Sequence, residues 1–85
     1  MEYVIAVFRS RAETIRFYEF LTSNGFGATI INTPKEAGVG CGLSVKVPFG
    51  ATALVKRAAA YFPAKTFAGF FAVKASGGKR IVKSV

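Results

Sequence analysis

The chain has 85 residues, of which 52% are hydrophobic, and 12 lysine and arginine residues stand against four acidic ones, with no histidine and one cysteine. This length predicts a single domain over residues 1–85, and the apolar content excludes a disordered chain. A single cysteine excludes an internal disulfide, and without histidine we expect no metal site and no bound cofactor.

The sequence predicts a cytoplasmic protein. No stretch reaches the ~20 apolar residues that a membrane-spanning helix requires. The apolar start, residues 3–8, follows Glu2 and is too short for a signal peptide. The formal net charge of +8 has two interpretations that stay open. It either serves solubility alone, or it favours an anionic partner such as RNA, phosphate or an acidic protein surface.

The first third of the chain predicts a strand followed by a helix. Residues 3–8 are apolar on both faces and rich in β-formers, which predicts a buried central strand. Ser10 and Glu13 have the spacing of a capping box, and Gly25 is a typical stop, so we expect a helix over residues 12–24. Glu13 and Phe20 are expected on its polar face. The expected inner face consists of Ile15, Phe17, Tyr18 and Leu21.

The rest of the chain predicts three more strands and a second helix. Residues 26–32 and 66–74 have strand composition, residues 43–47 alternate strictly, and residues 33–42 form a loop with three glycines and a proline. A helix is expected over residues 51–62, ended by Pro63. Residues 75–85 are either a hairpin strand or a basic tail. The expected inner stripe of the second helix is Leu54, Val55, Ala58, Tyr61 and Phe62.

This order of elements, βαββαβ, predicts an α+β ferredoxin-like fold. Such a fold has a four-stranded antiparallel sheet of order 4-1-3-2 with two helices on one face, which places residues 66–74 at an edge. The other sheet face is then bare. Because residues 3–8 and 66–74 are apolar on both sides, we expect a second copy to cover that face in a homodimer.

The expected topology brings Cys41 to the start of the first helix. The end of the first strand, that helix and the 33–42 loop share one edge, so Cys41 should lie near Arg9, Ser10, Arg11 and Lys65. A helix N-terminus and guanidinium groups favour an anion and therefore the thiolate form of a cysteine.

The loop composition supports chemistry at Cys41. Gly40 and Gly42 let backbone N–H groups approach whatever the sulfur carries. The alternative, a free cysteine packed as a small hydrophobe, stays open. Since a Cys–His dyad is impossible here, we expect transfer or carriage of a sulfur-type group and not hydrolysis, hence a carrier protein more than an enzyme.

A resemblance adds to this interpretation. The segments 30–36 (IINTPKE) and 40–44 (GCGLS) are similar to a family of short bacterial proteins labelled selenium/sulfur carrier protein-like, and the resemblance extends over residues 3–73. It implies that Cys41 accepts a persulfide or selenide group, with Thr33, Pro34 and Gly42 as motif companions. It also implies a cysteine desulfurase or a selenium-pathway protein as partner.

The resemblance has a limit, because the Cys-Pro-x-Pro motif of the small sulfur carriers that feed tRNA thiolation is absent. In this chain Gly42 follows Cys41. With the resemblance included, the candidate catalytic residue is Cys41. The candidate substrate- or anion-binding residues are Arg9, Ser10, Arg11, Thr33, Pro34, Gly40 and Gly42.

Two other classes remain as alternatives. The fold plan, the charge and the aromatic run at residues 69–73 suit an RNA- or anion-binding module. However, that run is expected on an edge strand, and the central strand at 43–47 has no aromatic residue on which a base could stack. The third class is a regulatory dimerisation module without chemistry.

Overall fold

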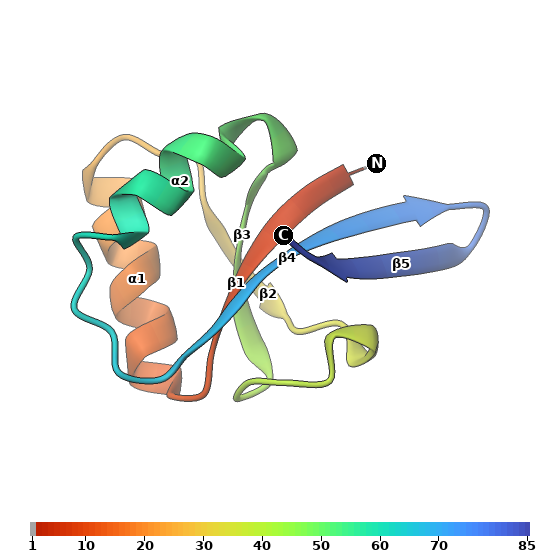
Figure 1. Cartoon of the computed structure of the whole chain (residues 1–85), viewed down its shortest axis with the longest axis horizontal. Helices are drawn as coiled ribbons and strands as arrows, with labels where there is room; N and C mark the ends of the chain where they lie inside the picture. Colours follow the sequence, from red (N-terminus) through yellow and green to blue (C-terminus); the bar gives the residue numbers. More distant parts are fainter. Residues whose placement is uncertain (1) are drawn as a thin grey trace.

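The computed structural model describes residues 2–85 and shows an α+β fold with two α-helices and one antiparallel sheet (Figure 1). The sheet has five strands in the order β2-β3-β1-β4-β5, and every neighbouring pair is antiparallel. The strands are β1 (Glu2–Phe8), β2 (Thr29–Asn32), β3 (Leu43–Pro48), β4 (Phe67–Ser76) and β5 (Lys79–Ser84). The helices are α1 (Arg11–Ser23) and α2 (Thr52–Ala59), with short 3-10 helices η1 (Lys35–Ala37) and η2 (Phe49–Ala51).

The prediction of a four-stranded sheet is wrong, because residues 79–84 add the fifth strand. A two-residue turn joins β4 to β5, with Ser76 paired to Lys79. Gly77 and Gly78 hold φ values of +57° and +77° there, which is the backbone that such a turn demands and that glycine adopts freely. As a result β4, which we expected at an edge, is an interior strand between β1 and β5.

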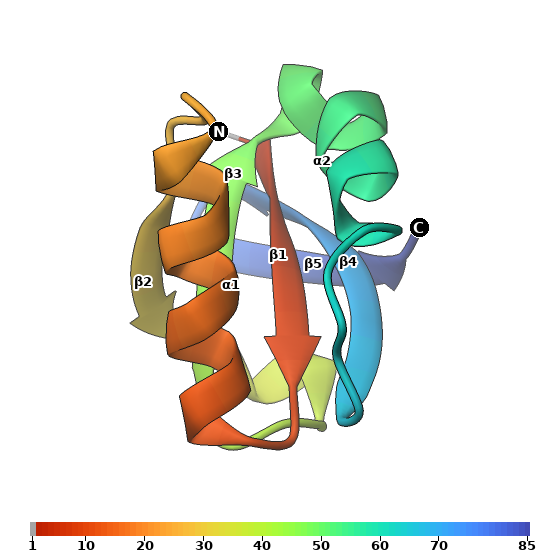
Figure 2. The ribbon, with the colours of Figure 1, turned by 90° about the vertical axis from the view of Figure 1, so that its left-hand side faces the viewer.

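Both helices cover the same face of the sheet (Figure 2). The main core lies between them and the strands, because β1 and β3 present alternate side chains to that face. The phenylalanine rings of Phe8 and Phe17 meet at the centre, 5.2 Å apart between centroids. The buried members of this core are Val4, Ala6, Phe8, Phe17, Leu21, Val45, Val47, Val55 and Phe70.

The second face of the sheet is not bare, which corrects the expectation above. Ile5, Val7 and Val73 are fully buried there. The β5 hairpin, η1 and neighbouring side chains pack against them, and the contacting residues include Ile31, Ala37, Phe71 and Val82. An ion pair between Arg80 of β5 and Glu36 of η1, 3.0 Å long, joins the two covering segments. A bare sheet face was the reason for expecting a homodimer, and that reason fails. Self-association stays a prediction.

Helix α1 begins and ends close to its predicted bounds of 12–24, but the residues on its inner face differ from those predicted. Ser10 is the N-cap, with its Oγ accepting the Glu13 N–H at 3.3 Å, and Gly25 follows the helix at φ +82°. Glu13 is buried, whereas Ile15 is 38% exposed. Phe20 is also not on a polar face: it is half-buried against the Phe62 ring, 5.5 Å away. The helix is rotated relative to the predicted stripe because Glu13 has partners inside the fold.

Helix α2 is shorter than predicted. It ends at Ala59, and Tyr61 and Phe62 continue in turns whose N–H groups bond to the carbonyl three residues earlier. The following Pro63 disfavours helical backbone at Phe62 and has no N–H to donate to the Ala59 carbonyl, so the helix cannot continue through these residues. Of the predicted stripe, Leu54 and Tyr61 point outward, at 55% and 84% exposure.

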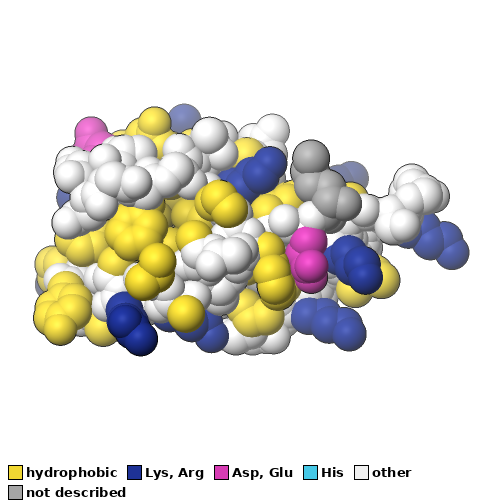
Figure 3. Space-filling model, turned by 90° about the horizontal axis from the view of Figure 1, so that it is seen from above, with side chains coloured by type: hydrophobic (Ala, Val, Ile, Leu, Met, Phe, Trp, Pro, Cys, Tyr) yellow, Lys and Arg dark blue, Asp and Glu magenta, His cyan; other side chains and the backbone are white. Residues whose placement is uncertain are grey.

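The surface is divided between apolar and basic regions (Figure 3). Lysine and arginine side chains gather around the β4–β5 hairpin, where Lys74, Lys79, Arg80 and Lys83 are exposed. None of the helices within residues 2–85 has the length and apolar character needed to cross a membrane.

The second core generates a stability prediction. Val73→Ala removes buried methyl groups from it and should lower the free energy of unfolding by about 2 kcal/mol. The neighbouring exposed Lys74→Ala is the matched control and should change it by less than about 0.5 kcal/mol. Urea unfolding measures the free energy of both variants, provided that its slope against urea concentration is the same as in the wild type. Equal, small effects of the two substitutions would show that the second face is not packed.

Candidate functional site

The loop between β2 and β3, residues 33–42, holds Cys41 and is closed at its base. The Thr33 N–H donates to the Gly42 carbonyl at 2.9 Å. The Thr33 hydroxyl and the Ser44 hydroxyl lie 2.6 Å apart and share a hydrogen bond. Thr33 therefore holds the two ends of the loop together. Ser44 is buried; it ends the segment 40–44 that carries the resemblance, but it was not among the predicted site residues.

The loop also lies against the end of β1. The Cys41 N–H donates to the Phe8 carbonyl at 3.1 Å. Gly40 and Gly42, on either side of Cys41, both have φ +96°, a backbone that other residues rarely adopt. A Cβ at Gly40 would lie 2.4 Å from Val7 Cγ1 and 3.2 Å from the Phe8 carbonyl oxygen. Glycine at position 40 is thus needed both for the backbone conformation and for the close approach to β1.

The Cys41 side chain is exposed, and its sulfur contacts the first turn of α1. Sγ lies 3.6 Å from Thr14 Oγ1 and 3.8 Å from the Leu43 carbonyl oxygen. The Thr14 hydroxyl is 3.0 Å from the Ser10 carbonyl, to which it donates. Because the hydroxyl and the thiol have one proton each, the thiol can donate either to the Leu43 carbonyl or to Thr14 while Thr14 donates to Ser10. Thr14 can donate to a thiolate when it turns away from Ser10.

Thr14 was missed by sequence reasoning. It is fully buried and lies three and seven residues before Phe17 and Leu21, on the same helix face. This helical spacing indicates in the sequence that Thr14 belongs to the inner face of the helix. A threonine among large apolar residues on an inner face was a reason to look for a polar partner.

The predicted cationic residues lie at the same end of the fold as Cys41, but they do not touch it. Ser10 is linked to the thiol through Thr14. Arg9 and Arg11 are exposed, and within residues 2–85 no hydrogen bond joins either guanidinium to Cys41. Arg9 instead contributes its backbone N–H, which donates to the Thr66 carbonyl at 2.8 Å.

The remaining predicted residues share one groove beside Cys41. Thr33, Pro34, Gly40 and Gly42 line it together with Lys35, Gly38 and Val39, and its volume is about 240 Å³. Pro34 is buried, and the groove is open to solvent along the loop. The structure thus brings these four candidate residues together around the backbone that flanks the thiol.

Glu13 fixes the helix start next to the site. Its carboxylate accepts hydrogen bonds from the Lys65 N–H at 2.9 Å, the Thr66 N–H at 2.9 Å and the Thr66 hydroxyl at 2.6 Å. The Ser10 N–H, which a capping box would satisfy with the glutamate, donates to Thr66 Oγ1 at 3.0 Å. These hydrogen bonds, the Thr66 hydroxyl first, hold the pKa of Glu13 below its ordinary value of 4.5.

Metal-ligating side chains do not gather in the described part of the chain. Nowhere in residues 2–85 do three or more cysteine, aspartate or glutamate side chains lie close enough to hold one ion. The chemistry of the site is therefore considered for Cys41 and its neighbours alone.

Comparison with known proteins identifies the family. A family model described as "Putative Se/S carrier protein-like" matches residues 3–62. The chain belongs to this family. A search of curated proteins and a search of solved structures each gave no match. The part that matches the carrier family includes the Cys41 loop and all of α1 and ends before β4, so the Glu13 partners Lys65 and Thr66 lie outside it.

Three glycine-to-alanine substitutions test the loop geometry. Gly27→Ala, at ordinary φ and in open space, should change stability little. Gly42→Ala, in open space at φ +96°, should cost about 1–3 kcal/mol through backbone strain alone. Gly40→Ala should cost more, because its Cβ also meets Val7. Urea unfolding measures all three. A Gly40→Ala variant no less stable than Gly42→Ala would contradict the close approach to β1.

Acid titration tests the role of Glu13. Because its pKa is lowered in the folded state, the charged carboxylate stabilises the fold at neutral pH, and this contribution is lost as pH falls below about 4.5. Glu13→Gln should therefore melt several degrees lower than the wild type at pH 7, and the difference should shrink under acid. Glu19→Gln, an exposed change on the same helix, should change the melting temperature little at any pH. A pH-independent gap for Glu13→Gln would disprove the charge-based account.

Proposed function

We propose that this protein carries sulfur or selenium on Cys41, as a persulfide or as the corresponding selenide adduct. The observation that carries the proposal is an exposed thiol on a loop whose backbone is tied to β1 by the Cys41–Phe8 hydrogen bond. Such a thiol is accessible to a donor and an acceptor, yet it is held in one place. Membership of the carrier family supports the same chemistry.

Loading is a thiol exchange that needs no oxidant. The Cys41 thiolate attacks the terminal sulfur of a donor persulfide, R–S–SH. A bond forms between Sγ and the transferred sulfur, the S–S bond of the donor breaks, and the electron pair leaves with the donor as R–S⁻. The product is Cys41–S–SH. A donor of the form R–S–SeH gives Cys41–S–SeH by the same exchange, and delivery to an acceptor thiolate is the reverse reaction.

Neighbouring groups suit an anionic sulfur at this position. The Thr14 hydroxyl lies within reach of Sγ and can donate to a thiolate, and the open groove along Gly40 and Gly42 leaves room for a second sulfur or selenium atom. Arg9 and Arg11 add positive charge at the same end of the fold, which favours anions at long range. In this proposal Thr14 is a positioning residue and Cys41 the reacting one.

The donor in this proposal is a cysteine desulfurase or a selenium-pathway protein, and the site of action is the cytoplasm, where thiols stay reduced. The formal charge of +8 suits a partner with an acidic docking face. No bound cofactor is needed for the exchange.

The alternatives are less well supported. Cys41 is exposed, which does not suit a cysteine packed as a small hydrophobe. In the aromatic run of β4, the Phe70 ring is buried in the main core and Phe71 is half-buried in the second one. These rings are used for packing and are not free to stack on RNA bases.

Mass spectrometry tests the carrier proposal. After incubation with a cysteine desulfurase and cysteine, the wild type should gain one sulfur that reductant removes, while Cys41→Ser should gain none. Since the side chain is exposed, Cys41→Ser should melt within a few degrees of the wild type. The wild type alkylated at Cys41 beforehand is the control for sulfur bound elsewhere. A wild type that takes up neither sulfur nor selenium, with a destabilised serine variant, would defeat the proposal.

A matched pair of threonine substitutions separates the positioning role from stability. Thr14→Val should slow sulfur uptake about fivefold, which is the rate effect expected from the loss of one hydrogen bond. Thr22→Val removes a hydroxyl from the exposed end of the same helix and should leave the uptake rate unchanged. Equal rates for the two variants would remove Thr14 from the mechanism.

A further inference from the structure

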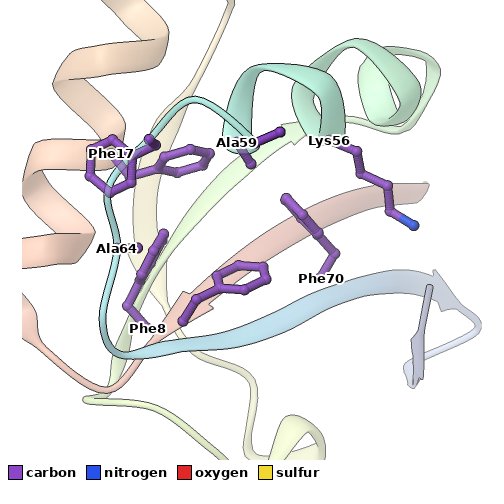
Figure 4. Close-up of a pocket in the computed structure, with 9 residues that line it drawn as sticks. Phe8, Phe17, Lys56, Ala59, Ala64 and Phe70 are labelled. Carbon is purple, nitrogen blue, oxygen red and sulfur yellow. The ribbon is translucent and has the colours of Figure 1, made fainter.

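An aromatic cavity lies between α2, β1 and β4, on the helix face of the sheet (Figure 4). Its volume is about 310 Å³. Three alanines and the side chain of Lys56 line it, together with five phenylalanines: Phe8, Phe17, Phe62, Phe67 and Phe70. Cys41 is not part of its lining, and the carrier proposal makes no use of this cavity.

The aromatic walls support one another, so the cavity is formed in the absence of a ligand. The Phe8 ring lies 5.2 Å from the Phe67 ring and 6.0 Å from the Phe62 ring between centroids. Phe67 and Phe70 meet edge to face at 4.9 Å. Edge and tilted arrangements of this kind are favourable for aromatic pairs. The rings therefore have little reason to collapse into the space between them.

The size and lining define the apolar part of a ligand. A dry cavity of about 150 Å³ lined by apolar side chains binds benzene. A cavity of about 310 Å³ has room for about two rings of that size. Alanine at positions 59, 60 and 64 keeps this part of the lining small.

Lys56 defines the polar part of the ligand. It is the one charged residue among those that line the cavity. Its Nζ lies 5.9 Å from the Phe70 ring centroid, and Figure 4 shows its side chain running from α2 down beside that ring, with Nζ on the side away from Phe8 and Phe17. A cationic group at the rim of an apolar cavity complements a ligand with an apolar body and an anionic end.

We propose that this cavity is a binding site for a small aromatic monocarboxylate of about two fused rings. The rings lie against Phe62 and Phe67, the two lining phenylalanines that are not buried, and the carboxylate pairs with the Lys56 ammonium at the rim. Lys56 is exposed, so the ion pair contributes modestly and the ring contacts supply most of the affinity.

Titration with 2-naphthoate tests the proposal on the intact protein. Calorimetry and amide chemical shifts should show one molecule bound per chain, with a Kd of about 1 mM or tighter. The neutral 2-naphthamide should bind about two- to fivefold more weakly, and Lys56→Gln should weaken binding of the carboxylate by the same factor. Lys79→Gln, a matched loss of one positive charge on β5, should leave the Kd unchanged.

Filling the cavity provides the decisive variant. Ala59→Leu places a larger side chain in the space and should abolish binding. If that variant does not fold, Ala60→Leu replaces it, because Ala60 is exposed and still lines the cavity. No binding of 2-naphthoate, binding that survives a filled cavity, or equal affinity for acid and amide would each overturn the proposal. So would a dimer in light scattering that Ala60→Leu dissociates, because a second copy would then occupy the site.

Discussion

The structure depends on the carboxylate of Glu13, which joins the start of α1 to the segment that leads into β4. Three hydrogen bonds from Lys65 and Thr66 reach this one buried side chain across more than fifty residues of sequence. Because a buried carboxylate is costly without such partners, the contact fixes both segments. The rotation of α1 follows from it, and so does the position of Thr14, one residue further, against the Cys41 sulfur.

Strand β1 connects the two halves of the molecule. Its alternate side chains supply both cores, with Phe8 in the main core and Ile5 and Val7 in the second. The same Phe8 has a ring that lines the aromatic cavity and a carbonyl that receives the Cys41 N–H. The thiol and the cavity therefore share one residue at the end of one strand, although their side chains face different surroundings.

Local sequence signals predicted the helix start at Ser10, the stop at Gly25 and the strand alternation, because each depends on residues a few positions apart. They also placed the 33–42 loop beside α1. They failed for Glu13, because its capping-box spacing predicted a local contact with Ser10 on the polar face, whereas its carboxylate bonds to Lys65 and Thr66 far away in sequence. They failed again for the second face, since residues 79–84 alternate weakly and their burial depends on η1. The spacing of Thr14 from Phe17 and Leu21 indicated its place on the inner face of α1, but no local pattern contains its contact with Cys41.

The two sides of the loop that holds Cys41 are held by different kinds of contact. Hydrogen bonds to Phe8 and Thr33, and a glycine with no room for a side chain, hold the side that meets β1. On the other side, η1 reaches β5 through Glu36 and Arg80, whose side chains are each 42% exposed. At about 1 M salt the Debye length falls to about 3 Å, close to the 3.0 Å length of this exposed pair, so salt at that concentration weakens it. High ionic strength should therefore weaken the η1 side of the loop before the side held by Phe8 and Thr33, while the packing of Ala37 against the second core is kept.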